Sequence, residues 1–411
     1  MTTSAAPTKV VRVIARLNTG GPAIHTILLT RGLNGSRFSS VLVTGRVTGA
    51  EGDMRYYAAR MNVEPVILPD LGRPIAPLKD VRALCQLYRV MRNAQPDIIH
   101  THTAKAGLLG RLAGLLYNAG AWWAGRRPAR LVHTFHGHLF DGYFGSVWST
   151  LLVLAERVLA RLSHQIIAIS ESVKRDLVER YRICPHDKVA VVPLGFDFGW
   201  VGSLSEHAGL IRGRLGTPPE AVIVGIVGRL TEIKNHRLLF ASVARLNRDD
   251  VRLVVFGDGE LRADLEHAVE GLGLKGVIIF VGWEADPGKI YADLDIVCLT
   301  SRNEGTPVAL IESMAASKAV ISTGVGGVDD LMVGAPAPHP DGFDIYRNGI
   351  LVRSEDEAGL AAALRYLCDR PGLRQAMGSA GRASVERRFS EQRLVADMEA
   401  IYTRLLGQRP S

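Results

Sequence analysis

Short runs of apolar residues alternate with longer amphipathic stretches along most of the chain. The runs are continuous and rich in Val and Ile, which is typical of strands buried on both faces of a sheet. Helical periodicity separates them, so the pattern predicts parallel strands connected by helices. In the first half we expect strands at 10–17, 41–44, 66–68, 97–102, 131–135, 166–170 and 189–193, and helices from Pro22 and at 78–93, 104–117, 147–162 and 171–181.

The alternation stops over residues 198–220, where Gly, Ser and Pro are frequent, and we expect a linker there. It then starts again, with predicted strands at 221–227, 251–256, 277–281, 295–300, 319–322 and 350–352. The two series predict two Rossmann-like, doubly wound parallel-sheet domains, 1–199 and 200–388, that face a central cleft. Residues 373–406 are helical in pattern, and 389–411 are expected to form a C-terminal helix that packs back on the N-terminal domain.

Charge is distributed unevenly between the two halves. The net charge of +8 divides into +12 over residues 1–199 and −4 over the remainder. An excess of cations in the N-terminal half favours an anionic partner such as phosphate or anionic lipid, although solvated surface charge gives the same asymmetry. No nucleic-acid-binding module is recognisable, so we expect no nucleic-acid partner.

One candidate ligand site follows the predicted strand at 295–300. Glu304, Gly305, Thr306 and Pro307 stand there in sequence, with Thr306 expected as a helix N-cap and Pro307 as the first helical residue. The free N–H groups at such a helix start favour a phosphate. Glu304 and Glu312 would repel a phosphate, so we expect them to accept hydrogen bonds from sugar hydroxyls; two solvated carboxylates are the alternative.

A second candidate site follows the first strand of the second half. Gly228 begins a turn that carries Arg229 and Lys234 before a helix. Two cations at this position could neutralise a diphosphate leaving group without a metal ion. An ordinary loop with surface charges is the alternative for this motif taken alone.

Together, in this order, the two motifs resemble glycosyltransferase family 4, the large retaining group with the GT-B fold. Supporting matches are the VPLGFD run at 192–197, the FGDG run at 256–259 and the FVG run at 280–282. The resemblance covers nearly the whole chain and points most closely to bacterial enzymes that build surface polysaccharides. It implies a hexosyltransferase that uses a UDP- or GDP-sugar and needs no metal or other cofactor.

The resemblance also implies roles for individual residues. Arg229 and Lys234 would hold the donor diphosphate, with backbone N–H groups of Gly305 and Thr306 assisting. Glu304 would contact the transferred sugar and Glu312 the ribose. The remaining donor-binding positions in this half would be Gly228, Gly257, Gly282, Trp283 and Pro307.

The N-terminal half contributes a Gly-Gly turn and a group of histidines. Gly20 and Gly21 resemble the family's loop of small residues, which lets the backbone approach the donor. His136 is our candidate for the histidine that binds the donor sugar. A zinc site formed by His133, His136 and His138 is the alternative, but no cysteine or HExxH pattern supports it. His25, His100 and His102 are expected to be structural or to face the acceptor.

Two further motifs have structural interpretations. Asp293-Leu294-Asp295 is a DxD sequence, which binds metal in other glycosyltransferases, but we expect it to be a strand entry. The four cysteines form no CxxC pair, which favours free thiols.

The acceptor side is expected in the basic N-terminal domain. Residues 104–130 contain leucines, Trp122-Trp123 and three arginines, a composition typical of interfacial membrane contact over 115–130. Leucines buried in the core beside a solvated loop are the alternative. The start of the chain contains no signal peptide, so we expect a cytoplasmic enzyme, peripheral on the inner face of the plasma membrane, that acts on a lipid-linked saccharide.

Other functions share this architecture. Transfer to a soluble acceptor, sugar-nucleotide epimerisation and non-catalytic sensing of a nucleotide sugar are the alternatives. The first would show as activity on a water-soluble acceptor, the second as a product formed without any acceptor, and the third as donor binding without turnover.

Overall fold

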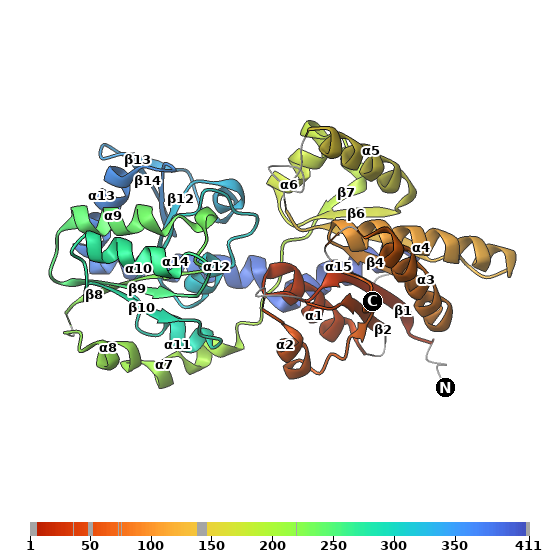
Figure 1. The fold of residues 1–411 in the computed structure, drawn as a ribbon, viewed down its shortest axis with the longest axis horizontal. Coiled ribbons are helices and arrows are strands. Elements are labelled where there is room, and N and C mark those ends of the chain that lie inside the picture. The colour runs from red at the N-terminus through yellow and green to blue at the C-terminus, as the bar shows by residue number, and fades with distance from the viewer. Residues whose placement is uncertain are drawn as a thin grey trace. The chain divides into compact units, whose positions relative to one another are not determined.

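The computed structural model describes residues 6–35, 37–47, 52–72, 74, 76–137, 146–218 and 220–407. The chain divides into two compact units (Figure 1). One contains Met1–Phe196 and Phe389–Ser411, and the other contains Asp197–Arg388. Each is an α/β unit built on a largely parallel sheet, as the alternation of apolar runs predicts.

The N-terminal unit contains a seven-stranded sheet of order β3-β2-β1-β4-β5-β6-β7. Its paired strands are parallel: β1 (Thr8–Arg16), β2 (Phe38–Gly45), β3 (Val66–Ile67), β4 (Ile98–His102), β5 (Arg130–Phe135), β6 (Gln165–Ala168) and β7 (Val189–Val191). The helices are α1 (Gly21–Leu33), α2 (Arg55–Arg60), α3 (Pro77–Ala94), α4 (Ala104–Trp123), α5 (Ser146–Leu162), α6 (Glu171–Arg175) and α15 (Glu391–Leu405).

Two apolar clusters cover the two faces of this sheet. The cluster on one face joins α3 and α4 to β1 and β4, and includes Leu87, Met91 and Ile99. The cluster on the other face joins α1 and α15 to the sheet through Leu29 and Leu394. Arg31 of α1 also forms an ion pair with Glu391. The last helix is therefore part of the N-terminal unit's core.

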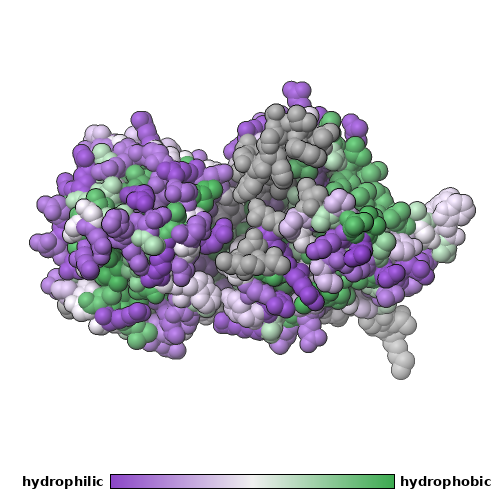
Figure 2. Space-filling view, in the orientation of Figure 1, coloured by the Kyte–Doolittle hydropathy of each residue, from purple (hydrophilic) through white to green (hydrophobic). Residues whose placement is uncertain are grey.

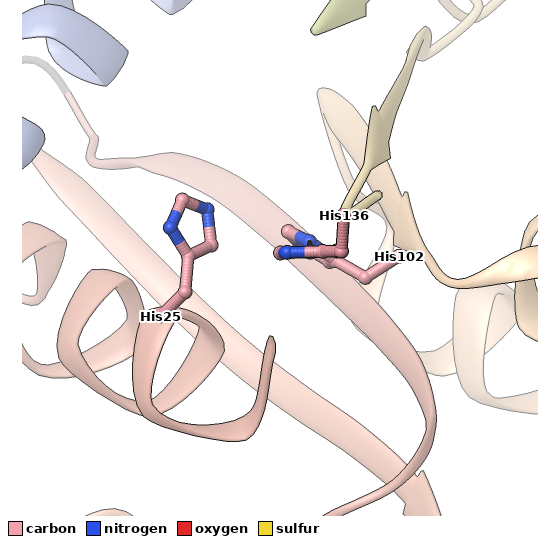
Figure 3. Close-up of side chains that lie close together, drawn as sticks. All are labelled: His25, His102 and His136. Carbon is pink, nitrogen blue, oxygen red and sulfur yellow. Dashed lines mark hydrogen bonds between the residues drawn. The ribbon is translucent and has the colours of Figure 1, made fainter. Parts of the chain in front are cut away.

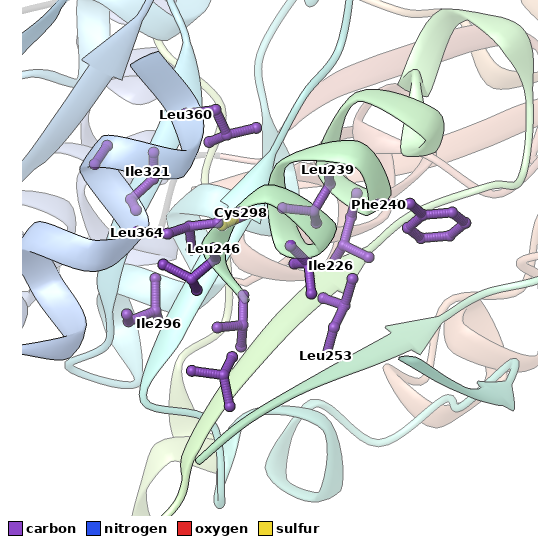
Figure 4. Packing of buried hydrophobic residues seen from close by; sticks show 14 of the residues in the cluster. Ile226, Leu239, Phe240, Leu246, Leu253, Ile296, Cys298, Ile321, Leu360 and Leu364 are labelled. Atoms are coloured by element: carbon purple, nitrogen blue, oxygen red, sulfur yellow. The ribbon is translucent and has the colours of Figure 1, made fainter. Parts of the chain in front are cut away.

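The C-terminal unit contains an eight-stranded sheet of order β10-β9-β8-β11-β12-β15-β14-β13. The strands are β8 (Val222–Val227), β9 (Val251–Phe256), β10 (Ile278–Gly282), β11 (Ile296–Leu299), β12 (Ala319–Thr323), β13 (Ala337–His339), β14 (Phe343–Tyr346) and β15 (Gly349–Val352). The helices include α9 (His236–Leu246), α10 (Arg262–Gly271), α11 (Pro287–Tyr291), α12 (Val308–Ala315), α13 (Glu357–Cys368) and α14 (Pro371–Phe389). Apolar side chains from β8, β11 and α9 interlock in its core, among them Ile226, Ile296 and Leu239 (Figure 4).

The strand order places a topological switch point in each unit. From β1 the order runs to β2 on one side and to β4 on the other, and from β8 it runs to β9 and to β11. Ligands of doubly wound sheets bind beyond the carboxyl ends of strands at such a point. The loops after β8 and β11, and those after β1 and β4, are thus the positions where this fold binds ligands.

Several sequence expectations need correction. Residues 198–220 are not a linker: they form η3 (Gly199–Ser203), α7 (Leu204–His207) and α8 (Leu210–Leu215) within the C-terminal unit. The predicted helix at 171–181 is α6 followed by a π-helical turn, η1 (Asp176–Arg180), and α4 extends to Trp123 rather than to residue 117. The antiparallel strands β13 and β14 and the short helix α2 have no counterpart in the prediction.

The helices are too short or too polar to cross a bilayer, among the residues that the structure describes. All four cysteines are free thiols, and only Cys85 among them is exposed.

Candidate functional site

The loops after β8 and β11 are joined by direct contacts. Lys234 lies in the turn before α9, and its Nζ donates a hydrogen bond to Glu304 Oε1 at 2.5 Å. Thr300 Oγ1 donates to the carbonyl oxygen of Lys234 at 3.0 Å. The N–H of Arg302 donates to the carbonyl oxygen of Ile233 at 2.8 Å. The two motifs singled out in the sequence therefore form one site at the switch point of the C-terminal unit.

Glu304 is held from two sides. Its Oε1 accepts a second hydrogen bond from Ser301 Oγ at 2.6 Å. Its backbone carbonyl accepts from the N–H of Gly327 at 3.0 Å. The side chain is buried, so the ammonium group of Lys234 compensates the carboxylate where water reaches it poorly. Ser301 and Gly327 are positioning residues that the sequence motifs did not reveal.

The glycines around these loops permit backbones to approach closely. A Cβ on Gly257, whose φ is +134°, would lie 1.9 Å from the carbonyl oxygen of Gly228. A Cβ on Gly327 would lie 1.8 Å from the carbonyl oxygen of Gly305. A side chain at Gly257, after β9, would push the β8 loop away, and one at Gly327, after β12, would push the β11 loop away. These two glycines therefore help to fix the positions of both loops of the site.

The start of α12 differs by one residue from the expected start. The helix begins at Val308, and Pro307 occupies the cap position with a ψ of 86°, outside the helical range. Pro307 is therefore not the first helical residue and Thr306 is not the N-cap. The open N–H groups of the first turn still lie directly after Glu304, where an anion would be favoured.

Glu312 is held by a residue that sequence reasoning missed. The Tyr291 hydroxyl, at the end of α11, donates to Glu312 Oε2 at 3.0 Å. Tyr291 is fully buried, and nothing in its local sequence marks it as a partner of Glu312. Burial raises the pKa of Glu312 to about 7, while the hydrogen bond from Tyr291 opposes that shift.

The raised pKa of Glu312 predicts a pH-dependent stability. The folded chain binds this proton more tightly than the unfolded chain, so the stabilisation is present below the ordinary value of 4.5 and is lost as the pH rises through about 7. We expect the melting temperature of the ligand-free protein to fall between about pH 5 and about pH 8, and to fall less in Glu312→Gln. Calorimetry across that range measures both; equal slopes would contradict the shift.

The other predicted donor-binding residues lie at the same edge of the sheet, with different degrees of contact. Arg229 is exposed and, within the described ranges, has no salt-bridge partner. Gly282 ends β10, and the N–H of Gly257 donates to its carbonyl at 2.8 Å. Trp283 follows and is 62% exposed. The structure thus joins Lys234 to Glu304 directly, whereas Arg229 and Trp283 are available to a ligand without contacting either residue.

The DxD sequence has a structural role, as expected. Asp293 accepts hydrogen bonds from the N–H groups of Gly209, Ile211 and Arg212 at the start of α8. Asp295 accepts from the N–H of Ile223 and pairs with Arg212 at 2.8 Å. These contacts fasten α8 to the strand entry, so the carboxylates are already used within the fold.

In the N-terminal unit the candidate residues surround the other switch point. Gly20 caps α1 in the loop that follows β1, with Gly21 as the first helical residue. His102 ends β4, and His136 follows β5. His102 Nδ1 and His136 Nε2 are 3.0 Å apart and share a hydrogen bond. Burial lowers the pKa of His136 to about 3, so its ring is neutral at physiological pH.

His133 cannot belong to the zinc site that its spacing from His136 and His138 suggested. Its Nδ1 shares a hydrogen bond with Thr101 Oγ1 at 2.9 Å, and a Cβ on Gly107 of α4 would lie 2.4 Å from its ring. The ring therefore faces α4, on the opposite side of the sheet from His136. His138 lies outside the described residues.

Residues 209–384 match the family model described as glycosyl transferases group 1, and residues 19–199 match the model described as glycosyltransferase family 4. The chain is 30% identical over 309 residues to the Escherichia coli UDP-Gal:alpha-D-GlcNAc-diphosphoundecaprenol alpha-1,3-galactosyltransferase, covering 72% of this chain and 76% of the relative. It is 25% identical over 346 residues to the capsular polysaccharide biosynthesis glycosyltransferase CapM of Staphylococcus aureus, covering 82% and 84%.

Solved structures with the same fold include a glycosyltransferase from Rickettsia africae, with a TM-score of 0.76, 18% identity and coverage of 97% of this chain and 99% of that one. Anabaena Alr3699/HepE in complex with UDP and glucose gives a TM-score of 0.73 at 19% identity, covering 96% and 99%. At these identities the structural likeness establishes the fold alone.

Proposed function

The chain belongs to glycosyltransferase family 4, whose members have the GT-B fold, and from this membership we propose that it transfers a hexose-type sugar from a UDP- or GDP-sugar to an acceptor hydroxyl. The observation that carries the proposal is the contact of Lys234 with Glu304 at the switch point of the C-terminal unit. It joins a cation suited to a diphosphate with a carboxylate suited to a sugar hydroxyl.

Each candidate residue has a role in this proposal. Lys234 and Arg229 neutralise the leaving diphosphate, and the backbone at Gly305, Thr306 and the start of α12 adds N–H donors. Glu304 Oε1 is engaged by Lys234 and Ser301, which leaves Oε2 to accept from a hydroxyl of the transferred sugar.

Three further residues complete the proposed donor contacts. Glu312, held by Tyr291, accepts from the ribose hydroxyls. Trp283 stacks against the nucleobase, and its exposed ring supports that role. His136 of the N-terminal unit hydrogen-bonds the sugar through a neutral ring nitrogen.

We propose that transfer requires no metal ion and retains the anomeric configuration. Fixed cations and a helix start supply the positive charge that a metal would otherwise supply. The DxD carboxylates already accept hydrogen bonds from backbone N–H groups of α8 and β8. In the retaining reaction the leaving phosphate oxygen takes the acceptor's proton, the acceptor oxygen bonds to the anomeric carbon, and the bond to the diphosphate breaks.

We expect UDP- or GDP-sugars to raise the melting temperature of the protein in EDTA and to turn over there. A thermal-shift screen followed by donor consumption measures this, and nuclear magnetic resonance of the product gives the anomeric configuration. An absolute need for a divalent ion, or an inverted product, would contradict the mechanism. Product formed without acceptor would instead favour an epimerase.

We propose a lipid-linked saccharide of cell-surface polysaccharide synthesis as the acceptor. The two relatives named above act, by their names, on a diphosphoundecaprenol-linked sugar and in capsular polysaccharide synthesis. The +12 charge of residues 1–199 supports binding to an anionic membrane surface, where a lipid-linked acceptor would be located.

Two helices of the N-terminal unit support this membrane assignment. Leu108, Leu112 and Leu116 are exposed along α4, although Leu109 beside them is buried. The spacing of four places the three on one stripe of the helix. The alternative interpretation of the sequence, that these leucines lie in the core, is therefore wrong for the three positions. Trp122 and Trp123 continue the exposed surface at the end of α4, at 67% and 83% exposed.

Helix α5 adds a second apolar stripe. Leu154, Val158 and Leu162 are exposed at the same spacing of four. The buried ion pair between Arg111 of α4 and Glu156 of α5 fixes the two helices side by side. Figure 2 shows hydrophobic side chains gathered over this part of the N-terminal unit. Apolar stripes next to exposed arginines, such as Arg126 and Arg127, suit insertion at an anionic bilayer surface.

We expect the protein to float with vesicles that contain anionic lipid, and the double variant Leu112→Asp/Leu116→Asp to remain largely in the soluble fraction. Each of the two leucines contributes about 1.5–3 kcal/mol when it inserts into the bilayer, so the loss of both weakens membrane binding at least about tenfold. Leu210→Asp, at a 52% exposed leucine of the C-terminal unit, is the matched control. No flotation of the native protein with either anionic or neutral vesicles would overturn the membrane assignment.

A further inference from the structure

Three histidines from separate elements converge in the N-terminal unit. His25 comes from the second turn of α1, His102 from the end of β4, and His136 from the segment after β5. One ligand atom from each ring lies within 4.8 Å of the others. In Figure 3 the ring of His25 faces the rings of His102 and His136. We call these three residues the histidine triad.

The triad contains buried polar atoms without partners. Among the described residues, neither ring nitrogen of His25 has a hydrogen-bond partner, nor do His102 Nε2 and His136 Nδ1. The side chains of His25 and His102 are fully buried. A neutral imidazole has one lone pair, so one nitrogen of each ring can bind a ligand. At His25 that lone pair has no partner in either tautomer, whereas His102 and His136 would exchange the hydrogen bond they share for bonds to the ligand.

From this geometry we propose that the histidine triad binds one divalent transition-metal ion of the Zn²⁺ class. Zn²⁺ takes imidazole nitrogens at about 2.0–2.1 Å in tetrahedral geometry, which separates neighbouring nitrogens by roughly 3.3 Å. The 3.0 Å contact between His102 Nδ1 and His136 Nε2 is close to that separation, and the ligand atoms of the three rings lie within 4.8 Å of one another. Mg²⁺ and Ca²⁺ prefer oxygen ligands and are excluded by an all-nitrogen triad.

The charge around the triad makes the bound ion exchangeable. No carboxylate is among the three ligands, and the buried guanidinium of Arg12 acts electrostatically on His25. The three ligands therefore do not neutralise the charge of the divalent ion, and Arg12 adds positive charge nearby. Water or a small anion would be the fourth ligand. This favours reversible binding over the permanent binding of a structural zinc site.

Metal at the triad has a consequence for turnover, and this step rests on the proposed function. His136 cannot ligate the ion and hydrogen-bond the donor sugar through the same orientation of its ring. The ion therefore inhibits sugar transfer by withdrawing His136, in a protein whose chemistry itself needs no metal.

The binding test uses untagged, full-length protein stripped with EDTA. We expect Co²⁺ to give the visible ligand-field absorption of a tetrahedral site, Zn²⁺ to bleach it, and titration to end at one ion per chain. His25→Gln and His102→Gln should each weaken Zn²⁺ binding at least about tenfold. His236→Gln is the matched control, because His236 is a buried histidine of the C-terminal unit with both ring nitrogens unpartnered.

Each outcome decides between the possibilities. Native Zn²⁺ affinity in both triad variants, with folding verified by circular dichroism, would overturn the site, as would the absence of any Co²⁺ absorption. Turnover inhibited by Zn²⁺ in the native protein and in His236→Gln, but much less in His25→Gln, would support the inhibitory step. If no nucleotide sugar turns over at all, the proposed function fails while the Co²⁺ titration still decides the metal site.

Discussion

Replacing Lys234 by alanine is expected to lower the kcat of sugar transfer by about 10²–10³-fold, the usual effect of removing one group that stabilises charge in a transition state. The substitution would remove two things together. One is the cation that meets the departing diphosphate, and the other is the partner that holds Glu304 Oε1. Glu304 would then be a buried carboxylate with Ser301 as its remaining side-chain partner.

The measurement is kcat at saturating donor and acceptor, alongside thermal unfolding to verify the fold. Lys275→Ala is the matched control, because that lysine of the C-terminal unit is 84% exposed in its side chain and should leave kcat unchanged. Because Lys234 and Glu304 are in contact, the loss in the double alanine variant should be smaller than the product of the two single losses. Full activity in Lys234→Ala would remove that residue from the mechanism.

The largest effect on stability is expected at Glu156. Its two carboxylate oxygens accept hydrogen bonds from Arg111 Nη2 at 2.8 and 2.7 Å, and both side chains are almost fully buried. Glu156→Ala would leave the guanidinium buried without its counter-charge, and breaking such a pair costs about 3–5 kcal/mol. Equilibrium urea unfolding followed by circular dichroism measures this loss.

The double variant Arg111→Met/Glu156→Leu separates charge from packing. It removes both charges at similar volume, so its stability should recover towards that of the native protein. Glu179→Ala, at an exposed carboxylate of the same unit, should unfold as the native protein does. If Glu156→Ala were no less stable than Glu179→Ala, the ion pair would have no role in fixing α4 against α5.

Some elements were predictable because their pattern depends only on neighbouring residues. The strands of both units are continuous apolar runs, and such runs have one stable environment, a sheet covered on both faces. The hairpin of β13 and β14 was missed although Asp341-Gly342 is a turn signal, because Pro338 and short strand lengths hide the alternation. Residues 198–220 read as a linker because their short helices are stabilised by contacts with distant residues such as Asp293.

The grouping of the histidines shows the same limit more sharply. Sequence proximity suggested His133 with His136, but the His133 ring faces α4 from within β5, whereas His136 follows the strand and contacts His102. The real neighbours of His136 are His25 and His102, one on a helix and one on the strand beside β5. Only the order of the strands in the sheet and the packing of α1 against that sheet bring them together.

The amino-acid sequence by itself determined the two α/β units, the family, and the motifs around Lys234 and Glu304, because local periodicity and short motifs contain that information. The tertiary structure decided which groups meet: Lys234 with Glu304, Tyr291 with Glu312, Arg111 with Glu156, and the three rings of the histidine triad. It also decided which leucines of α4 face solvent. The physical reason is that burial and pairing depend on elements far apart in the chain, which become neighbours only when the sheets form.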